Sequence, residues 1–113
     1  MASPLTTHVL NTASGLPAAN LSILLFQQVS GEWERRGEFR TDADGRVRDL
    51  LPAGELAAGD WELRFAVGEY FRQNGQTSFY EEVPVQFRVS ETARHHHVPL
   101  LVSPFGYSTY RGS

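Results

Sequence analysis

The sequence predicts an all-β fold, an antiparallel β-sandwich of short strands with one short helix. Apolar and polar residues alternate with period two in several segments, as in strands that have one buried and one solvated face. Turn-forming residues separate these segments at short intervals, without the regular strand-then-helix pattern of parallel α/β proteins. The length of 113 residues fits a single domain over residues 1–113.

In the first half of the chain, strand patterns alternate with turn residues. Residues 21–29 carry apolar side chains on both faces of the expected strand, so we expect both faces to be covered. The sequence Asp42-Ala43-Asp44-Gly45 indicates a hairpin turn, because glycine readily adopts the positive φ that such turns require. The expected strands of this half lie over residues 5–11, 21–29, 33–41 and 61–67.

The second half opens with a break in the alternation. Residues 69–74 lack the period of two and precede Gly75, which favours a short helix closed by that glycine. Residues 83–89 return to a clear alternation, with valines and Phe87 on one face. The sequence Ser103-Pro104-Phe105-Gly106 indicates a turn. The expected strands lie over residues 83–89, 95–102 and 107–111.

Composition excludes several classes of function. The formal net charge of −3 argues against a nucleic-acid partner, because phosphate binding needs a basic surface. Without cysteine the chain has no disulfide, thiolate metal site or cysteine nucleophile. Residues 1–7 have no signal-peptide pattern, and no segment approaches the ~20 apolar residues of a membrane span. We therefore expect a cytoplasmic protein with no membrane partner.

Histidines are the first candidates for chemistry. His95 and His97 lie two residues apart on an expected strand, so they share a face while His96 points the other way. Imidazoles on one face can transfer protons near neutral pH, or hold a metal with His8 as a third ligand. From spacing alone, a solvated strand face that happens to carry histidines is an equally good explanation.

Two further features carry polar groups that could meet a ligand. Arg46 directly follows the expected turn, where its guanidinium could bind carbonyl groups or simply remain a solvated surface side chain. The chain ends in Tyr110-Arg111-Gly112-Ser113, where alternation places Tyr110 and Arg111 on opposite faces. An edge strand with a loose end is the alternative for this segment.

Taken together, three segments resemble the 5-hydroxyisourate hydrolases of the transthyretin-like family. These are residues 5–15, the turn with its arginine at 41–46, and residues 95–113 with the terminal Tyr-Arg-Gly-Ser. Three positions depart from the pattern: Asn11 stands where aspartate is common, Glu81 where proline is common, and His96 where tyrosine is common.

The resemblance implies a transthyretin-like sandwich of two four-stranded sheets with one short helix. It also implies a homotetramer with active sites where dimers meet, a small-molecule substrate, and no cofactor. Carried over by position, the catalytic set is His8, Arg46, His97 and Tyr110, and the substrate-binding set is His8, Arg46, Tyr110 and Ser113, with no metal ligand.

The implied reaction is hydrolysis of 5-hydroxyisourate to 2-oxo-4-hydroxy-4-carboxy-5-ureidoimidazoline in urate degradation. Water attacks a ring carbonyl with the help of a histidine, either His8 or His97, while Arg46 stabilises the developing negative charge. Two alternatives remain open at this point. One is a binding module like transthyretin, which carries thyroid hormone on the same fold; the other is a zinc site of His8, His95 and His97.

Overall fold

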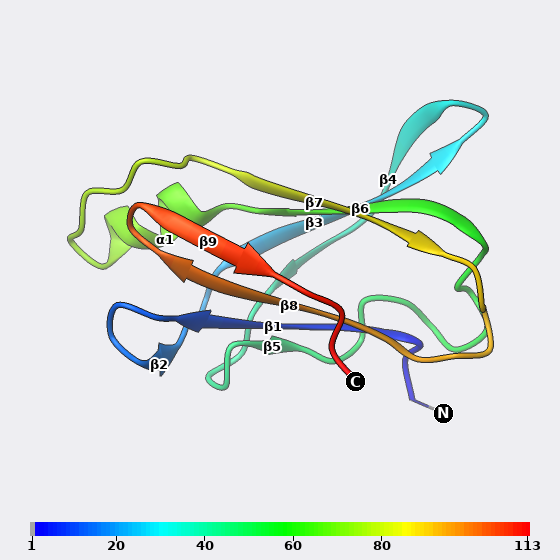
Figure 1. The fold of residues 1–113 in the computed structure, drawn as a ribbon, viewed down its shortest axis with the longest axis horizontal. Coiled ribbons are helices and arrows are strands. Elements are labelled where there is room, and N and C mark those ends of the chain that lie inside the picture. The colour runs from blue at the N-terminus through cyan, green and yellow to red at the C-terminus, as the bar shows by residue number, and fades with distance from the viewer. Residues whose placement is uncertain (1) are drawn as a thin grey trace.

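The computed structural model describes residues 2–113, and Met1 lies outside the described residues. Two β-sheets enclose the core, and a short helix lies at the end of the sandwich opposite the N-terminus (Figure 1). The five-stranded sheet contains β1 (Leu5–Asn11), β2 (Leu16–Pro17), β5 (Arg46–Val47), β8 (His96–Ser103) and β9 (Gly106–Thr109). The four-stranded sheet contains β3 (Ser22–Val29), β4 (Glu32–Arg40), β6 (Gly59–Phe65) and β7 (Val83–Val89), and the helix is α1 (Val67–Gln73).

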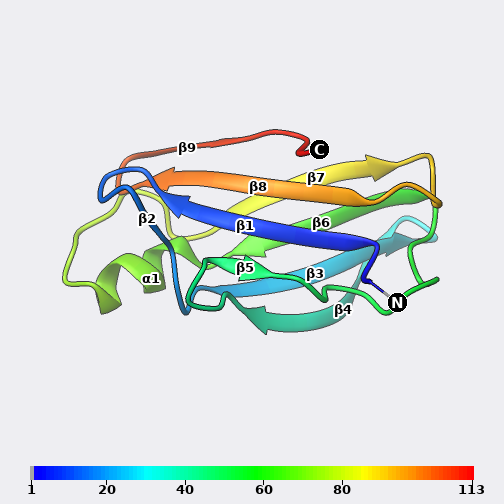
Figure 2. The same ribbon diagram turned by 90° about the horizontal axis from the view of Figure 1, so that it is seen from below.

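The two sheets differ in how their strands are connected. The four-stranded sheet has the order β4-β3-β6-β7 and is antiparallel throughout. In the other sheet the order is β2-β1-β8-β9, β5 also pairs with β1, and β1 runs parallel to β8 (Figure 2). The antiparallel sandwich predicted from the sequence is therefore confirmed, with this one parallel pair as the exception. A parallel pair needs a long connection, and here almost the whole chain lies between the two strands.

Period-two patterning accounts for the core. In β1 the residues Leu5, Thr7, Val9 and Asn11 are buried, while those between them are only half-buried. The largest fully buried side chains, Trp61, Phe65 and Phe71, come from β6 and α1. Each such side chain stabilises the fold by about 1.5–3 kcal/mol. The indole Nε1–H of Trp61 donates to the Ala57 carbonyl at 2.9 Å, so its polar atom is satisfied.

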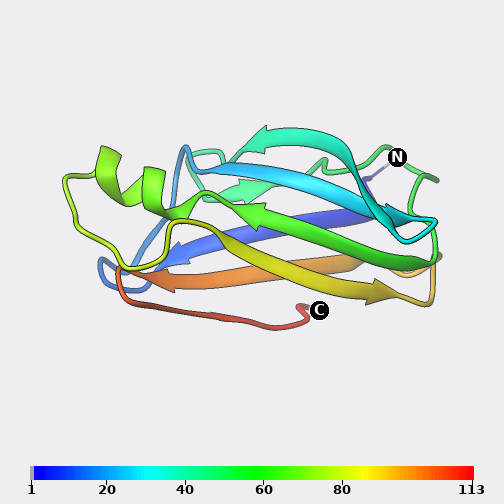
Figure 3. The same ribbon diagram turned by 90° about the horizontal axis from the view of Figure 1, so that it is seen from above.

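The sandwich predicted from the alternation is confirmed, with the helix shifted slightly toward the N-terminus. Figure 3 shows α1 following β6 at the end of the sandwich. The two-residue strands β2 and β5 were not predicted, because two residues are too few to show an alternation of apolar and polar side chains. No helix within residues 2–113 is long and apolar enough to cross a membrane.

Strand β3 is covered on one face only, contrary to the expectation from its apolar residues. Ile23 and Leu25 are buried in the core, whereas Leu24 and Phe26 are half-buried on the other face. The guanidinium of Arg64 lies over the Phe26 ring, 3.8 Å from its centroid. A cation–π contact of this kind shields an aromatic ring without a second protein layer.

Candidate active site

The outer face of the five-stranded sheet brings together polar side chains from distant parts of the sequence. His8 of β1 is half-buried and lies opposite Arg46 of β5 on one side and opposite Pro99 of β8 on the other. Directly opposed residues on paired strands project to the same face of a sheet. The His8 imidazole and the Arg46 guanidinium therefore project from the same face of the sheet, side by side.

His97 occupies the next row of the same face. It lies opposite Thr6, which is two residues before His8 on β1. Because residues two apart on a strand share a face, His97 and His8 are diagonal neighbours on adjacent strands. The parallel pairing of β1 with β8 is thus what brings the first histidine of the chain beside the last.

The turn before β5 fixes the position of Arg46. The Asp42 carboxylate accepts hydrogen bonds from the backbone N–H groups of Asp44, at 2.9 Å, and of Arg46, at 3.0 Å. Gly45 has φ +74°, and its carbonyl accepts from the Val9 N–H at 2.8 Å. A Cβ at Gly45 would lie 2.5 Å from the Val9 carbonyl oxygen, so glycine is required both by the backbone angle and by this close approach.

Thr6 links the two histidines that share its face. Its hydroxyl lies 2.8 Å from Nδ1 of His97 and 2.9 Å from Nε2 of His95. A hydroxyl has one hydrogen to donate and lone pairs that accept, so Thr6 can donate to one ring and accept from the other. Sequence reasoning gave Thr6 no role in the site, although Thr6 lies two residues before His8 on the same expected strand and therefore on the same face.

Burial and positive charge hold both site histidines in their neutral form. Partial burial lowers the pKa of His97, and the charges of Arg46, His95 and His8 lower it further. Partial burial, followed by the charge of Arg46, also lowers the pKa of His8 below its ordinary value of 6.5. A neutral imidazole has a free lone pair, so both side chains can accept a proton near pH 7.

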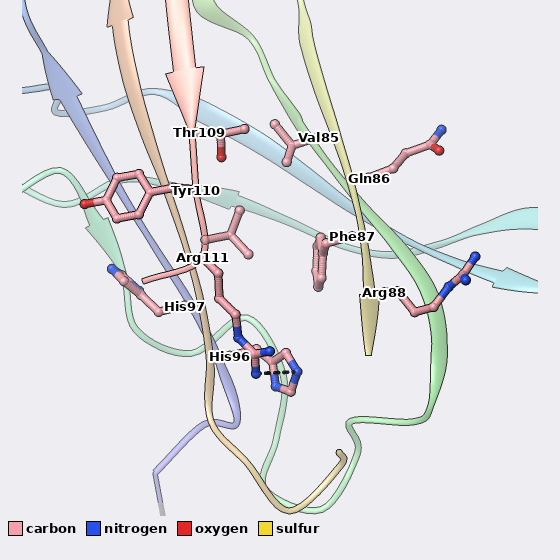
Figure 4. A pocket seen from close by; sticks show the side chains of 10 residues that line it. Val85, Gln86, Phe87, Arg88, His96, His97, Thr109, Tyr110 and Arg111 are labelled. Atoms are coloured by element: carbon pink, nitrogen blue, oxygen red, sulfur yellow. Dashed lines mark hydrogen bonds between the residues drawn. The ribbon is translucent and has the colours of Figure 1, made fainter. Parts of the chain in front are cut away.

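The C-terminal tail, residues 110–113, runs beside His97. The Gly112 N–H donates to the His97 carbonyl at 2.9 Å, and this bridge keeps the register of the β8–β9 pairing. Tyr110 therefore falls opposite Pro99, and its ring points to the same side of the sheet as the His97 ring (Figure 4). A Cβ at Gly112 would collide with the His97 ring, so only glycine lets the tail pass this close.

The residues predicted from the sequence are thus brought together to different degrees. His8, Arg46 and His97 lie close enough for their charges to act on one another. Tyr110 shares their face of the sheet but is 57% exposed. Ser113 is exposed and makes none of the hydrogen bonds found within residues 2–113.

The three departures from the family pattern lie away from this face. Asn11 accepts a hydrogen bond from the Ala13 N–H at 3.0 Å, which shapes the turn after β1. Glu81 forms a bidentate ion pair with Arg72, at 2.7 and 2.8 Å. His96 is buried on the inner side of β8, as the strand alternation predicted.

The structure does not show the arrangement of ligands that a zinc site of His8, His95 and His97 would need. Within residues 2–113 there is no group of three His, Cys, Asp or Glu side chains arranged to hold a metal ion. Instead, the Thr6 hydroxyl lies between His95 and His97. The face offers neutral imidazoles beside a guanidinium, an arrangement suited to proton transfer at a centre that develops negative charge.

Comparison with known proteins connects this geometry to a family. Residues 5–112 match the family model described as HIUase/Transthyretin family. The chain is 50% identical over 114 residues to the 5-hydroxyisourate hydrolase of Mesorhizobium japonicum, covering 96% of this chain and 91% of that protein.

Two solved structures resemble the fold closely. Sea bream transthyretin, crystallised in complex with thyroxine, superimposes with a TM-score of 0.92 at 31% identity and covers 96% of this chain and 94% of that chain. The 5-hydroxyisourate hydrolase of Klebsiella pneumoniae gives a TM-score of 0.81 at 33% identity and covers 96% of this chain and 92% of that chain.

Proposed function

Because the chain belongs to the HIUase/transthyretin family, we infer that it is an enzyme that hydrolyses 5-hydroxyisourate in urate degradation. The product is 2-oxo-4-hydroxy-4-carboxy-5-ureidoimidazoline. One observation carries the proposal: two imidazoles and a guanidinium from separate strands meet on one face of the five-stranded sheet. This set suits hydrolysis at an acyl carbon, which requires a proton acceptor and a group that stabilises an oxyanion.

We propose His97 as the general base. When Nδ1–H of His97 donates to the Thr6 hydroxyl, that hydroxyl donates in turn to Nε2 of His95. This network leaves the lone pair of His97 Nε2 free, and we assign to it the proton taken from the attacking water. Thr6 would then hold the imidazole in one tautomer, as orienting groups do for other catalytic histidines.

Arg46 and His8 act on the substrate rather than on the attacking water. As water adds to the ring carbonyl, negative charge develops on the oxygen, and the Arg46 guanidinium stabilises it. The tetrahedral centre then collapses, the adjacent carbon–nitrogen bond breaks, and the leaving nitrogen takes a proton. His8, which lies opposite Arg46 on the paired strand, would relay to that nitrogen the proton that His97 took from the water.

The tail supplies the remaining contacts in this proposal. Tyr110 would donate a hydrogen bond to the substrate ring, and Ser113 would bind the ring or the water from the chain end. Both residues are exposed, and Tyr110 gains an enclosed position only if another surface covers it. We therefore propose that the active chain is a homotetramer in which sites form where dimers meet. We also propose that it works in the cytoplasm.

A carrier is the competing function, since sea bream transthyretin shares the fold and was crystallised with thyroxine. A carrier of an aromatic hormone favours an apolar channel, whereas this face carries His8, Arg46 and His97. The polar set favours the hydrolase.

The test is the decay of ultraviolet absorbance of freshly prepared 5-hydroxyisourate. Wild-type protein should accelerate the decay, and His97→Ala should lose most of that acceleration. Arg35→Ala, an exposed change on β4 in the other sheet, serves as the control and should behave as wild type. A decay that wild-type protein does not accelerate would contradict the proposed function.

A further inference from the structure

His96 is buried on the inner side of β8, with only 5% of its surface exposed. Both of its ring nitrogens are engaged. Nδ1 lies 2.7 Å from the Arg94 carbonyl oxygen, and Nε2 lies 3.3 Å from the guanidinium of Arg111 (Figure 4). Because a carbonyl only accepts and a guanidinium only donates, Nδ1 must carry the hydrogen and Nε2 the lone pair. The neutral imidazole with this tautomer is the only form of His96 that satisfies both contacts.

The partner of this imidazole belongs to the tail. Arg111 stands between Tyr110 and Gly112, and its side chain points inward while the Tyr110 ring points to the outer face (Figure 4). Arg111 takes part in none of the ion pairs found within residues 2–113, so no carboxylate there competes with His96 for its guanidinium. The imidazole is an acceptor that holds the arginine without neutralising its charge.

The space around Arg111 offers little else to hold it. Its side chain lines a cavity of ≈ 240 Å³ between β7 and the tail, with Val85, Phe87 and Val98 as apolar neighbours. Side chains that line an open cavity are not fixed by packing, so direct hydrogen bonds decide their position. Within the plane of the sheet, the tail is tied to β8 by the Gly112 N–H bond to the His97 carbonyl.

We propose that His96 is a positioning residue: its Nε2 anchors Arg111 and thereby holds Tyr110 and Gly112 against His97 on the opposite face. Two contacts would thus hold the tail: the backbone bridge in the plane of the sheet and the imidazole–guanidinium contact on its inner face. The consequence for activity rests on the proposed hydrolase function. The consequence for the order of the tail does not depend on it.

The experiment replaces His96 with two amides, glutamine and asparagine, whose side chains differ only in length. The carboxamide oxygen of glutamine lies four bonds from Cα, as Nε2 of histidine does, whereas that of asparagine lies three bonds away, as Nδ1 does. His96→Gln therefore keeps an acceptor for Arg111, and His96→Asn, equally polar at the same buried position, does not. We measure kcat/KM for 5-hydroxyisourate and hydrogen exchange of the Gly112 amide in both variants.

We expect His96→Asn to lower kcat/KM roughly 5–10-fold, the effect of losing about one ordinary hydrogen bond. It should also speed exchange at Gly112, while His96→Gln stays within about twofold of wild type in both measurements. Arg111→Met, an exposed change with little consequence for folding, should reproduce the asparagine variant, and combining it with His96→Asn should add nothing further.

Equal behaviour of His96→Gln and His96→Asn would overturn the proposal, as would unchanged Gly112 exchange in Arg111→Met. If wild-type protein lacks hydrolase activity, the exchange measurements still decide whether His96 holds the tail. Val102→Ala, buried at the far end of β8, is the control for lost stability and should leave both measurements unchanged in folded protein.

Discussion

His96 and His97 are adjacent in the chain, yet they face two different environments on opposite sides of β8. His96 is buried, with one nitrogen bonded to a backbone carbonyl and the other to Arg111. His97 is half-buried, with one nitrogen at the Thr6 hydroxyl and the charge of Arg46 nearby. The first imidazole therefore has a fixed role in holding structure, and the second keeps a lone pair for chemistry. The side of the strand, rather than the residue type, decides what a histidine can do.

Equivalent substitutions at the two positions give the largest expected difference. Glutamine at position 97 cannot accept a proton near neutral pH, so His97→Gln should lower kcat by about 10²–10⁴-fold, the usual contribution of a general base. His96→Gln retains the acceptor that Arg111 needs and should have nearly wild-type activity. Steady-state rates of 5-hydroxyisourate decay for the two variants make the comparison. Similar losses at both positions would show that the two sides of β8 do not differ in function.

Removing the positive charge from the outer face should have the next largest effect. Arg46→Met keeps the length of the side chain but removes the guanidinium that we assign to the developing oxyanion. The expected loss in kcat is about 10²–10³-fold, as for other single groups that stabilise an oxyanion. Arg48→Met is the matched control, since Arg48 is an exposed neighbour paired with Asp42 and Asp44. Equal rates in the two methionine variants would remove Arg46 from the mechanism.

Thr6 offers a smaller and more selective test of the outer face. Thr6→Val is nearly isosteric but lacks the hydroxyl that contacts His95 and His97, so His97 loses its orienting partner. We expect kcat to fall roughly tenfold, the value of about one hydrogen bond, and Thr6→Ser to recover most of it. Circular dichroism should show both variants folded. If valine and serine behave alike, the hydroxyl does not orient the base.

The same comparison shows how far the sequence alone could lead. Alternation placed His97 and His96 on opposite faces, and the turn signal at Gly45 placed Arg46 directly after a turn; the structure confirms both placements, although the short strand that begins at Arg46 was not predicted. The Thr6 contact and the Arg111 contact were out of reach, because they depend on which strands are neighbours. The parallel pairing of β1 with β8 brings together residues about 90 positions apart, as between Thr6 and His97. Local periodicity carries no information about such a pairing.

The assembly proposed for the active site was also beyond local reasoning. Several large apolar side chains remain exposed, with Phe79 at 73% and Phe105 at 70%. Phe79, Tyr80 and Tyr107 stack edge-to-face with ring centroids 5.0 and 5.2 Å apart. Exposed apolar clusters of this kind commonly mark surfaces that meet another protein. Their positions follow from the fold, since the loop after α1 and the end of the sheet bring them together.

The pH dependence gives the finest distinction between the two faces. The pKa of His97 lies below 6.5 because burial disfavours its charged form and Arg46 repels it. A base works only when neutral, so activity should be full above that pKa and lost as the pH falls through it, with a midpoint below 6.5. In Arg46→Met the repulsion is gone, the pKa of His97 rises, and the falling limb of kcat should move to higher pH. Arg111→Met removes an arginine from the inner face, which does not contribute to the lowered pKa of His97, and should leave the limb in place. If the midpoint of the loss of kcat stays unchanged in Arg46→Met, or shifts in Arg111→Met, the charge of Arg46 does not set the pKa of the base.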